Sequence, residues 1–515
     1  MNFLNRAGKF RSLAAFTAAC VLTACGGGGG GGSGGDVLPL AQQCSPNNPY
    51  RGDATRATTS GSLSSEKAWL RSYMNGAYLW YDEMPSVDAN AAQYSVDTTG
   101  GFYGSIDGYF DALRTPALTT SGQRRDRFSF TYPTKDWNDL ARSGVALGYG
   151  IEWSMLSPTP PRSIRIAYIE PGSMAASAGL QRGDTLVSVN GVSADDGTSA
   201  GVDVLNAALF PSSVGTYTFV FSRAGSANLT RTFTAAAITK TPVLRTQVIT
   251  AGDGQKVGYI VFNDHIAPAE QQLITAINTL RTEGVSDLVL DLRYNGGGYV
   301  FIASEVAYMV AGQSRTQGLV FERFQYNNKR TTENAAPGTP FYNTSCILNA
   351  NFQCTNEQPL PSLDLPRVYV LTSGSTCSAS ESIINGLRGI NVQVNIVGTT
   401  TCGKPYGFTA KDNCGISYFP IEFKGVNAKG FGDYADGFGA NCTAGDDLGR
   451  ALGDVNEAKL ATALYMRANG NACPPVPLGL GKQALTAFKQ GQPVSDGSLL
   501  RGPQRESRIH LPLQR

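Results

Sequence analysis

The spacing of apolar side chains changes twice along the chain and divides the sequence into three patterns. Residues 64–140 carry apolar side chains at helical spacing, as in "AWLRSYMNGA" and "SIDGYFDAL", which predicts a small, mostly helical domain. Residues 145–243 show short alternating stretches separated by glycine turns, which predicts strands. Residues 250–470 alternate apolar strands with amphipathic helices and predict an α/β domain.

The α/β region begins with clear element signals. "KVGYIVF" predicts a strand, "PAEQQLITAINTLRTEG" a helix that ends at Gly284, and "VSDLVLDLR" a strand followed by "YNGGG" and a helix from about Val300. Residues 313–365 are polar and predict an inserted arm. After it, "RVYVLTS" predicts a strand, and "CGISYFPIEFKG" predicts another beyond residue 410.

Composition narrows the range of functions. The chain has 515 residues, with 42 basic and 40 acidic side chains and a net charge of +2. We find no basic stripe interleaved with aromatic residues, so we do not expect nucleic-acid binding.

The N-terminus predicts export. Arg6, Lys9 and Arg11 precede the apolar run "LAAFTAACVLTAC", which has the layout of a secretion signal. The closing "LTAC" resembles the lipobox of bacterial lipoproteins, which implies cleavage before Cys25 and lipidation of that cysteine. The glycine-rich stretch over 26–35 is then a tether. The resemblance implies the bacterial cell envelope, as an outer-membrane lipoprotein that faces the periplasm or the cell surface; a plain signal peptide with a chance cysteine is the alternative.

Eight cysteines remain after Cys20 and Cys25, an even number that favours disulfides in an oxidising compartment. Sequence proximity suggests three pairs and leaves Cys44 and Cys377 over; the suggested pairs are Cys346 with Cys354, Cys402 with Cys414, and Cys442 with Cys473. No cysteine or histidine cluster has the spacing of a metal site.

The segment "IRIAYIEPGSMAASAGLQRGDTLVSVNG" (164–191) resembles PDZ domains of bacterial proteases. That resemblance implies that a glycine turn upstream offers N–H groups to the C-terminal carboxylate of a peptide that adds a strand to the sheet edge. The residues of this turn are Gly148, Tyr149, Gly150 and Ile151. The alternative is a plain β-domain in which glycines serve only as turns.

The stretch "GSTCSASESIINGLRGI" (374–390) places a serine where a strand turns into a helix. Ser378 at a helix N-terminus lies where unpaired N–H groups and the helix dipole favour developing negative charge, which suits a nucleophile. The alternative is that Ser378 or Ser380 caps the helix, with Glu381 completing a capping box.

A serine nucleophile needs a base. The chain has two histidines, His265 in "FNDH" and His510 near the C-terminus. A buried lysine is the other option, because desolvation disfavours its ammonium form. Lys404 in "GTTTCGK" follows Ser378 by 26 residues, which allows a helix and a strand to bring the two together.

These motifs together resemble the C-terminal processing peptidases, or tail-specific proteases, which use a Ser/Lys dyad. "TCSASE" matches the nucleophile motif at Ser378, and "GTTTCGK" matches the lysine turn at Lys404. "DLRYNGGG" (291–298) matches a segment that implies an oxyanion hole from the N–H groups of Gly297 and Ala379. The resemblance also implies a crotonase/Clp-like α/β spiral of ββα repeats as the peptidase core.

Two positions depart from the family pattern. Family members commonly carry glutamine four residues after the lysine, and Phe408 stands there. We therefore expect Lys404 to be oriented by a backbone carbonyl or by a hydroxyl such as that of Thr400. Cys377 adjoins the nucleophile and predicts either a disulfide that fixes the loop or, as a minor alternative, a catalytic cysteine.

Four aspartates near the end of the core lack the spacing of a calcium loop, and we interpret them as solvated carboxylates; they are Asp433, Asp436, Asp446 and Asp447.

The sequence therefore predicts a lipid-anchored serine endopeptidase without a cofactor or metal. Its PDZ domain recruits proteins with exposed C-termini. A catalytically weak PDZ adaptor is the alternative, and the oligomeric state is not predicted. The predicted domains are a signal peptide (1–24), a lipidated flexible linker (25–63), a helical N-terminal domain (64–140), a PDZ domain (141–243), the peptidase core (244–473) and a flexible tail (474–515).

Overall fold

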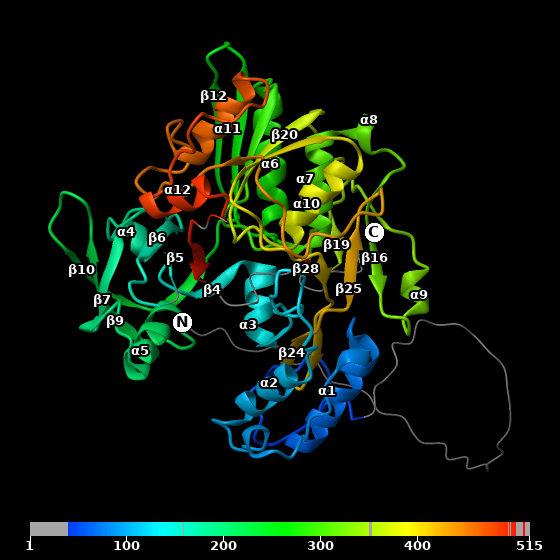
Figure 1. Cartoon of the computed structure of the whole chain (residues 1–515). Helices are drawn as coiled ribbons and strands as arrows, with labels where there is room; N and C mark the ends of the chain where they lie inside the picture. The colour runs from blue at the N-terminus through cyan, green and yellow to red at the C-terminus, as the bar shows by residue number, and fades with distance from the viewer. Residues whose placement is uncertain are drawn as a thin grey trace, which may run out of the picture. The chain divides into compact units, whose positions relative to one another are not determined.

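The structure is a computed structural model of the chain, and it describes residues 40–157, 159–349, 353–492, 494, 496–500 and 508–509. Cys25 and His510 lie outside the described residues. Figure 1 shows the arrangement of the labelled elements. In the described part of the chain, no helix is both long and apolar enough to cross a membrane.

The N-terminal region is helical as predicted. Its main helices are α1 (Leu63–Ala77) and α2 (Phe102–Ala112), and β3 (Phe130–Pro133) and α3 (Thr134–Asn138) follow them. The N-cap of α1 is Ser62, which forms a capping box with Ser65. The apolar face of α1 packs into the same hydrophobic cluster as the helices of the α/β domain, so this region shares the core of that domain.

Residues 40–63 do not form the flexible linker that we predicted. They contain β1 (Gln43–Cys44) and β2 (Thr59–Ser60), which pair in parallel. A disulfide joins Cys44 to Cys414, and the Gln42 N–H donates to Asn413 Oδ1 (2.7 Å). The sequence did not show this because both contacts are made with residues about 370 positions away.

The predicted PDZ region contains a six-stranded path with the order β10-β9-β7-β6-β5-β27 and a hydrophobic cluster of its own. Five of these strands come from this region: β5 (Ile151–Met155), β6 (Ile164–Ile169), β7 (Thr185–Val189), β9 (Thr216–Ser222) and β10 (Leu229–Thr234). The sixth, β27 (Ser498–Leu500), comes from the C-terminal tail. The remaining elements here are β4 (Val145–Gly148), α4 (Met174–Ser177), β8 (Val192–Ser193), α5 (Ser199–Leu209) and β11 (Ala236–Thr239).

The α/β domain is built on a six-stranded sheet with the order β12-β13-β14-β20-β21-β26. The strands are β12 (Val243–Thr250), β13 (Lys256–Phe262), β14 (Asp287–Asp291), β20 (Arg367–Thr372), β21 (Gln393–Gly398) and β26 (Cys442–Thr443). β12 is antiparallel to β13, and the other pairs are parallel. The α/β class is therefore confirmed.

Helices cover both faces of this sheet. α6 (Ala269–Thr282), α7 (Val300–Ala311) and α10 (Ala379–Gly389) contribute to one hydrophobic cluster with the sheet, and α11 (Ala458–Ala468) contributes to the other. The left-handed conformation of Gly284 (φ +68°) follows α6, as the sequence predicted. The parallel strands β14, β20 and β21 are neighbours, so the loops after their carboxyl ends meet at one edge of the sheet.

The arm over residues 313–365 joins a smaller sheet. β16 (Val320–Tyr326) pairs with β25 (Phe423–Val426), and the Cys346–Cys354 disulfide closes a turn of the arm. The single strand predicted over "CGISYFPIEFKG" is instead two strands, β24 (Ile416–Phe419) and β25, separated at Pro420, which has no N–H to donate to a ladder. The remaining short elements are α8 (Gln313–Thr316), α9 (Thr331–Asn334), β17 (Thr339–Pro340), β18 (Ile347–Leu348), β19 (Cys354–Thr355), β22 (Tyr406–Gly407) and β23 (Lys411–Asn413).

The C-terminal segment was predicted as a flexible tail, and its described residues are instead structured. It contains α12 (Lys482–Lys489), β27 and β28 (Arg508–Ile509). β28 pairs in parallel with β15 (Gly298–Tyr299). Two of these elements, β27 and β28, are held by pairing with the edges of β5 and β15.

Candidate active site

Ser378 lies at the N-terminus of α10, in the loop that follows β20, and its side chain is fully buried. Its backbone has φ +61° and ψ −114°. Ordinary N-cap residues adopt extended φ and ψ, as Ser62 and Ser173 do in this chain. Capping alone therefore does not account for the conformation of Ser378. A strained serine between a strand and a helix is typical of a nucleophile turn.

The loops that carry Ser378 and Lys404 lie side by side because N–H groups of both loops donate hydrogen bonds to the Glu381 carboxylate. The Ser378 N–H and the Lys404 N–H both donate to Glu381 Oε2 (2.9 and 2.8 Å). The Gly403 N–H and the Thr401 hydroxyl donate to Glu381 Oε1 (2.8 and 2.6 Å). Burial raises the pKa of the Glu381 carboxyl, while these hydrogen bonds act in the opposite direction. Glu381 thus does more than complete the predicted capping box.

A disulfide joins the same two loops. Cys377 pairs with Cys402, with 5.1 Å between their Cα atoms, and the Cys402 N–H donates to the Thr376 carbonyl (3.0 Å). The predicted pairing of Cys402 with Cys414 is wrong, since Cys414 pairs with Cys44. The other two predicted pairs are confirmed, Cys346 with Cys354 and Cys442 with Cys473. Cys377 is a disulfide partner, so the minor hypothesis of a catalytic cysteine does not hold for this oxidised form.

The Lys404 side chain is fully buried and its Nζ atom lies over two aromatic rings. The Nζ atom is 4.6 Å from the centre of the Phe408 ring and 5.0 Å from the centre of the Phe128 ring. Phe408 stands where the family commonly has glutamine, and its ring contacts Nζ in place of that side chain. Cation–π attraction stabilises the ammonium that forms when Lys404 takes up a proton. The neighbouring Thr401 donates its hydroxyl to Glu381 Oε1. Orientation of Lys404 by a backbone carbonyl or by the Thr400 hydroxyl stays a prediction.

The predicted oxyanion donors lie at the loops around Ser378. Ala379 is the first residue of α10, so its N–H is at the positive end of the helix. The Gly297 N–H donates to Asn295 Oδ1 (2.9 Å) in this structure, and Gly297 has φ +101°. The Gly297 N–H can donate to an oxyanion only after it has left Asn295 Oδ1.

Asn295 connects the predicted oxyanion loop, the nucleophile loop and His265, and the sequence analysis did not single it out. Its carbonyl accepts from the Cys377 N–H and from the Ser380 hydroxyl (both 3.0 Å). Its Oδ1 atom lies 2.9 Å from His265 Nδ1. The place of Asn295 in the "YNGGG" turn, two residues before Gly297, was the feature of the sequence that could have identified it.

His265 is fully buried, and burial lowers its pKa to about 3. The imidazole is therefore neutral at physiological pH. Its Nε2 atom has no hydrogen-bond partner among the described residues. The ring lies on Phe262, with 4.4 Å between the ring centres, at a small cavity that Gly297 and Tyr299 also line.

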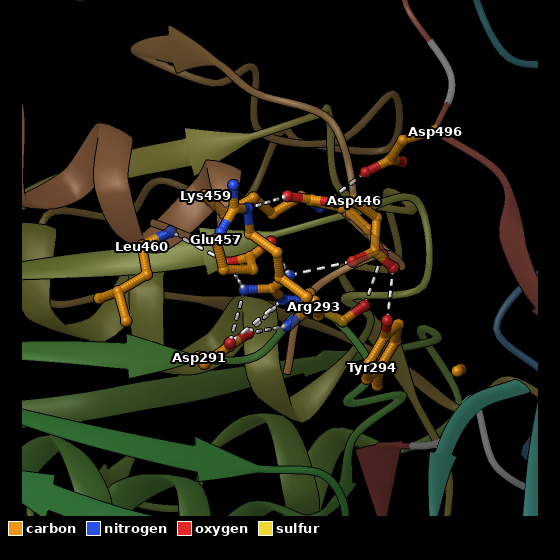
Figure 2. Close-up of polar contacts among 12 residues, drawn as sticks. Asp291, Arg293, Tyr294, Asp446, Glu457, Lys459, Leu460 and Asp496 are labelled. Carbon is orange, nitrogen blue, oxygen red and sulfur yellow. Dashed lines mark hydrogen bonds and ion pairs between the residues drawn. The ribbon is translucent and has the colours of Figure 1, made fainter. Parts of the chain in front are cut away.

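Figure 2 shows a buried ionic network around Arg293, whose carbonyl accepts a hydrogen bond from the Ser373 hydroxyl. Arg293 pairs with Asp291 (2.8 Å), Glu457 (2.7 Å) and Asp446 (3.0 Å), and Arg182 of the PDZ region also pairs with Asp446. Burial alone would raise the pKa of Asp446, but the two arginines lower it well below its ordinary value. The interpretation of Asp446 as a solvated carboxylate was therefore wrong.

The predicted peptide-binding turn of the PDZ region lies between β4 and β5. Gly150 has φ +84°, and a cavity of about 750 Å³ lies beside the turn. This cavity is lined by all four predicted residues: Gly148, Tyr149, Gly150 and Ile151.

Two clusters in the described part of the chain have metal-like composition, but each contains a disulfide. They are Cys44, Glu66 and Cys414, and Cys377, Glu381 and Cys402. Their sulfurs are not thiolates, so neither cluster resembles a metal site.

These observations define a class: an α/β protein with an appended PDZ domain, in which a buried serine at a helix N-terminus and a buried lysine lie on two loops joined to each other. Comparisons with known proteins agree. Residues 256–411 match peptidase family S41, residues 65–130 match the peptidase S41 N-terminal domain, and residues 165–205 match a PDZ domain. The three matches follow the order of the predicted domains, so the chain is similar to peptidase family S41 both in its α/β domain and in its N-terminal region.

Two curated relatives are cyanobacterial. A carboxyl-terminal-processing protease of Picosynechococcus sp. is 28% identical over 236 residues, which cover 45% of this chain and 49% of that protein. A carboxyl-terminal-processing protease of Synechocystis sp. is 26% identical over 288 residues, which cover 55% of this chain and 58% of that protein. The chain thus spans about half the length of the first relative and 58% of the second.

A solved structure shows the same fold. The crystal structure of a putative S41 protease from Bacteroides fragilis is 24% identical, with a TM-score of 0.58, and the match covers 78% of this chain and 98% of that one.

Proposed function

We propose that this chain is a serine endopeptidase of the C-terminal-processing type. The observation that carries the proposal is the strained Ser378 at the start of α10, on a loop joined to the Lys404 loop by Glu381 and by a disulfide. Loops joined in this way keep a nucleophile and its base in register.

In the proposed reaction, Lys404 accepts the proton of the Ser378 hydroxyl, and the oxygen attacks a peptide carbonyl. The N–H groups of Ala379 and Gly297 stabilise the oxyanion. The protonated Lys404 then gives its proton to the leaving amine. Water hydrolyses the acyl-enzyme in a second step with the same proton transfers.

We propose that the PDZ domain recruits proteins with exposed C-termini. The glycine turn from Gly148 to Ile151 leads into β5 and lies beside the 750 Å³ cavity, which matches the geometry of strand addition next to such a turn. No cofactor or metal takes part in this proposal.

The test is hydrolysis of casein by the chain without residues 1–35, beside Ser378→Ala, Lys404→Ala and His265→Ala. Ser382→Ala, one turn further along α10 and equally buried, is the matched control. We expect loss of turnover for Ser378→Ala and Lys404→Ala and retention for Ser382→Ala. Turnover that survives Lys404→Ala but not His265→Ala would assign the base to the histidine. Absence of turnover in every version, with peptide binding retained, would favour the adaptor.

We also propose that Cys25 carries a lipid that anchors the protein in the bacterial envelope, on the outer membrane. The support is the charged and apolar N-terminal sequence that ends in "LTAC" and the glycine tether behind it. Incorporation of labelled palmitate by the full chain, and its loss in Cys25→Ala, is the expected result. Equal labelling of both versions would refute the anchor at Cys25.

A further inference from the structure

The C-terminal segment is held against the core before it reaches the PDZ sheet. The side chain of Asp496 is 5% exposed and pairs with Lys459 (2.6 Å), and it accepts from the Thr399 hydroxyl (3.0 Å). Figure 2 shows Asp496 approaching the ionic network from the tail. Three residues later, the Leu499 N–H donates to the Ser375 hydroxyl (2.9 Å), on the same loop as Ser378. The segment is therefore attached to the nucleophile loop itself.

The tail then adds a strand to the edge of the PDZ sheet. β27 pairs antiparallel with β5, so that Ser498 faces Met155 and Leu500 faces Trp153. Along β27 the chain runs toward the glycine turn at Gly148–Ile151, which is the direction that a peptide ligand takes when it adds a strand beside such a turn. Leu500 lines the 750 Å³ cavity together with that turn.

Further along, the tail adds a second strand beside the proposed oxyanion loop. Arg508 faces Gly298 and Ile509 faces Tyr299 in parallel register, and Ile509 also bridges to Phe408. The short strand β28 thus lies between Gly298–Tyr299 and Phe408, whose ring contacts Lys404 Nζ.

The side chain of Ile509 is buried, with 5% of its surface exposed, and it lies at a small cavity of about 20 Å³. The walls of this cavity are mainly apolar and include Trp137, Leu140, Ala141, Ile266 and Tyr299. An extended chain with an aliphatic side chain at this place is therefore well accommodated.

We infer that the segments Asp496–Leu500 and Arg508–Ile509 are a tethered peptide ligand, that the edge of β5 is the position of a recruited peptide, and that the edge of β15 is the position of a substrate strand. A strand edge pairs with one strand at a time, so a substrate must displace the tail. The substrates that compete best carry an aliphatic residue where Ile509 lies. Occupancy of the β5 and β15 edges by the tail rests on the strand pairing alone. Competition between the tail and a substrate rests on the proposed peptidase function.

Occupancy is tested without catalysis, in the full chain with Ser378→Ala. Backbone amide exchange is compared between this chain and the same chain with Leu500→Asp or Ile509→Asp. We expect faster exchange in β5 for Leu500→Asp and in β15 for Ile509→Asp. Phe488→Asp, on the exposed side of α12, is the matched tail control and leaves both strands unchanged. Unchanged exchange in β5 and β15 for both tail variants overturns the inference.

Competition is tested in the full chain with Ser378 intact. We expect casein hydrolysis to rise at least fivefold for Ile509→Asp, and a synthetic peptide of residues 496–515 to reverse that rise. The same peptide with aspartate at position 509 should inhibit at least tenfold more weakly. Equal hydrolysis by the parent and Ile509→Asp would mean that the tail only stabilises the fold and does not compete with substrate, which overturns the inference. If no version hydrolyses casein, the peptidase proposal fails, while amide exchange and binding of the peptide to the Ile509→Asp chain still decide whether the tail is a ligand.

Discussion

The disulfide between Cys377 and Cys402 gives the sharpest test of how the proposed dyad is held together. It joins the residue before Ser378 to a residue two positions before Lys404. Replacing both cysteines with alanine removes the bond while keeping the buried site apolar. The Glu381 hydrogen bonds remain, so we expect the fold to persist and the two loops to lose part of their alignment.

A second disulfide, Cys442–Cys473, provides a control for the stability lost on removing Cys377–Cys402. In the chain-entropy description, the 25-residue separation of this disulfide corresponds to about 3.5 kcal/mol of stabilisation. The Cys442–Cys473 disulfide spans 31 residues, which corresponds to about 3.7 kcal/mol. The two double-alanine variants should therefore lose similar stability, although Cys442 and Cys473 lie outside both dyad loops.

Activity should separate the two variants. Displacements of about 1 Å at reacting groups cost up to about 100-fold in rate. We expect kcat to fall at least tenfold for Cys377→Ala/Cys402→Ala and less than twofold for Cys442→Ala/Cys473→Ala. Peptide hydrolysis is measured at a temperature where circular dichroism shows both to be folded. Equal falls in kcat would refute the reasoning, because the disulfide would then act only through global stability.

Three further substitutions test the parts of the site. Glu381→Gln should lower kcat about 100-fold and lower the melting temperature, because one of the two acceptor oxygens becomes an NH2 group and two of the four buried donors lose their acceptor; unchanged kcat would contradict this. Phe408→Leu should lower kcat about fivefold through the loss of about 1 kcal/mol of cation–π attraction, whereas Phe419→Leu, in the same aromatic cluster, should not. His265 has a pKa lowered to about 3 by burial, so the unfolded chain takes up a proton below pH 6.5 that the folded chain does not, and stability falls on acidification. From pH 7 to 4 this amounts to about 3 kcal/mol, and urea unfolding of His265→Gln should show a correspondingly smaller loss; an equal loss in both chains would contradict the shift.

Local signals predicted the parts of the fold whose contacts are local. The alternation of strands and helices in the α/β domain, the start of α7 at Val300 and the stop at Gly284 all follow from periodicity and helix-end residues. The position of Ser378 at the start of a helix was predicted for the same reason, since a strand, a short turn and a helix follow one another in the sequence.

Contacts between distant residues were not predicted in the same way. Cys402 lies 12 positions from Cys414 and 25 from Cys377, and sequence proximity chose the wrong partner because it carries no information about strand order. Glu381 looked like the end of a capping box, since its second role depends on loop 401–404 arriving beside it. Phe408 replaces the glutamine that the family commonly has. Its ring and the Phe128 ring, which comes from the N-terminal region, both contact Lys404 Nζ.

The sheet topology explains why these distant groups meet. β14, β20 and β21 are adjacent and parallel, so the loops that begin after Asp291, Thr372 and Gly398 emerge at one edge. The first carries Asn295 and Gly297, the second Ser378, and the third Lys404. The central loop touches both of the others, through the Cys377 N–H to the Asn295 carbonyl and through the Cys377–Cys402 disulfide.

The same central loop also binds the tail, because Ser375 accepts from the Leu499 N–H three residues before the proposed nucleophile. Displacing β27 from β5 therefore breaks a hydrogen bond to the loop that carries Ser378. A ligand that takes the edge of the PDZ sheet thus acts on the nucleophile loop directly, through the tail that it displaces. The inferred peptide position on β5 and the loop of the proposed nucleophile are therefore joined by one hydrogen bond of the tail, between Leu499 and Ser375.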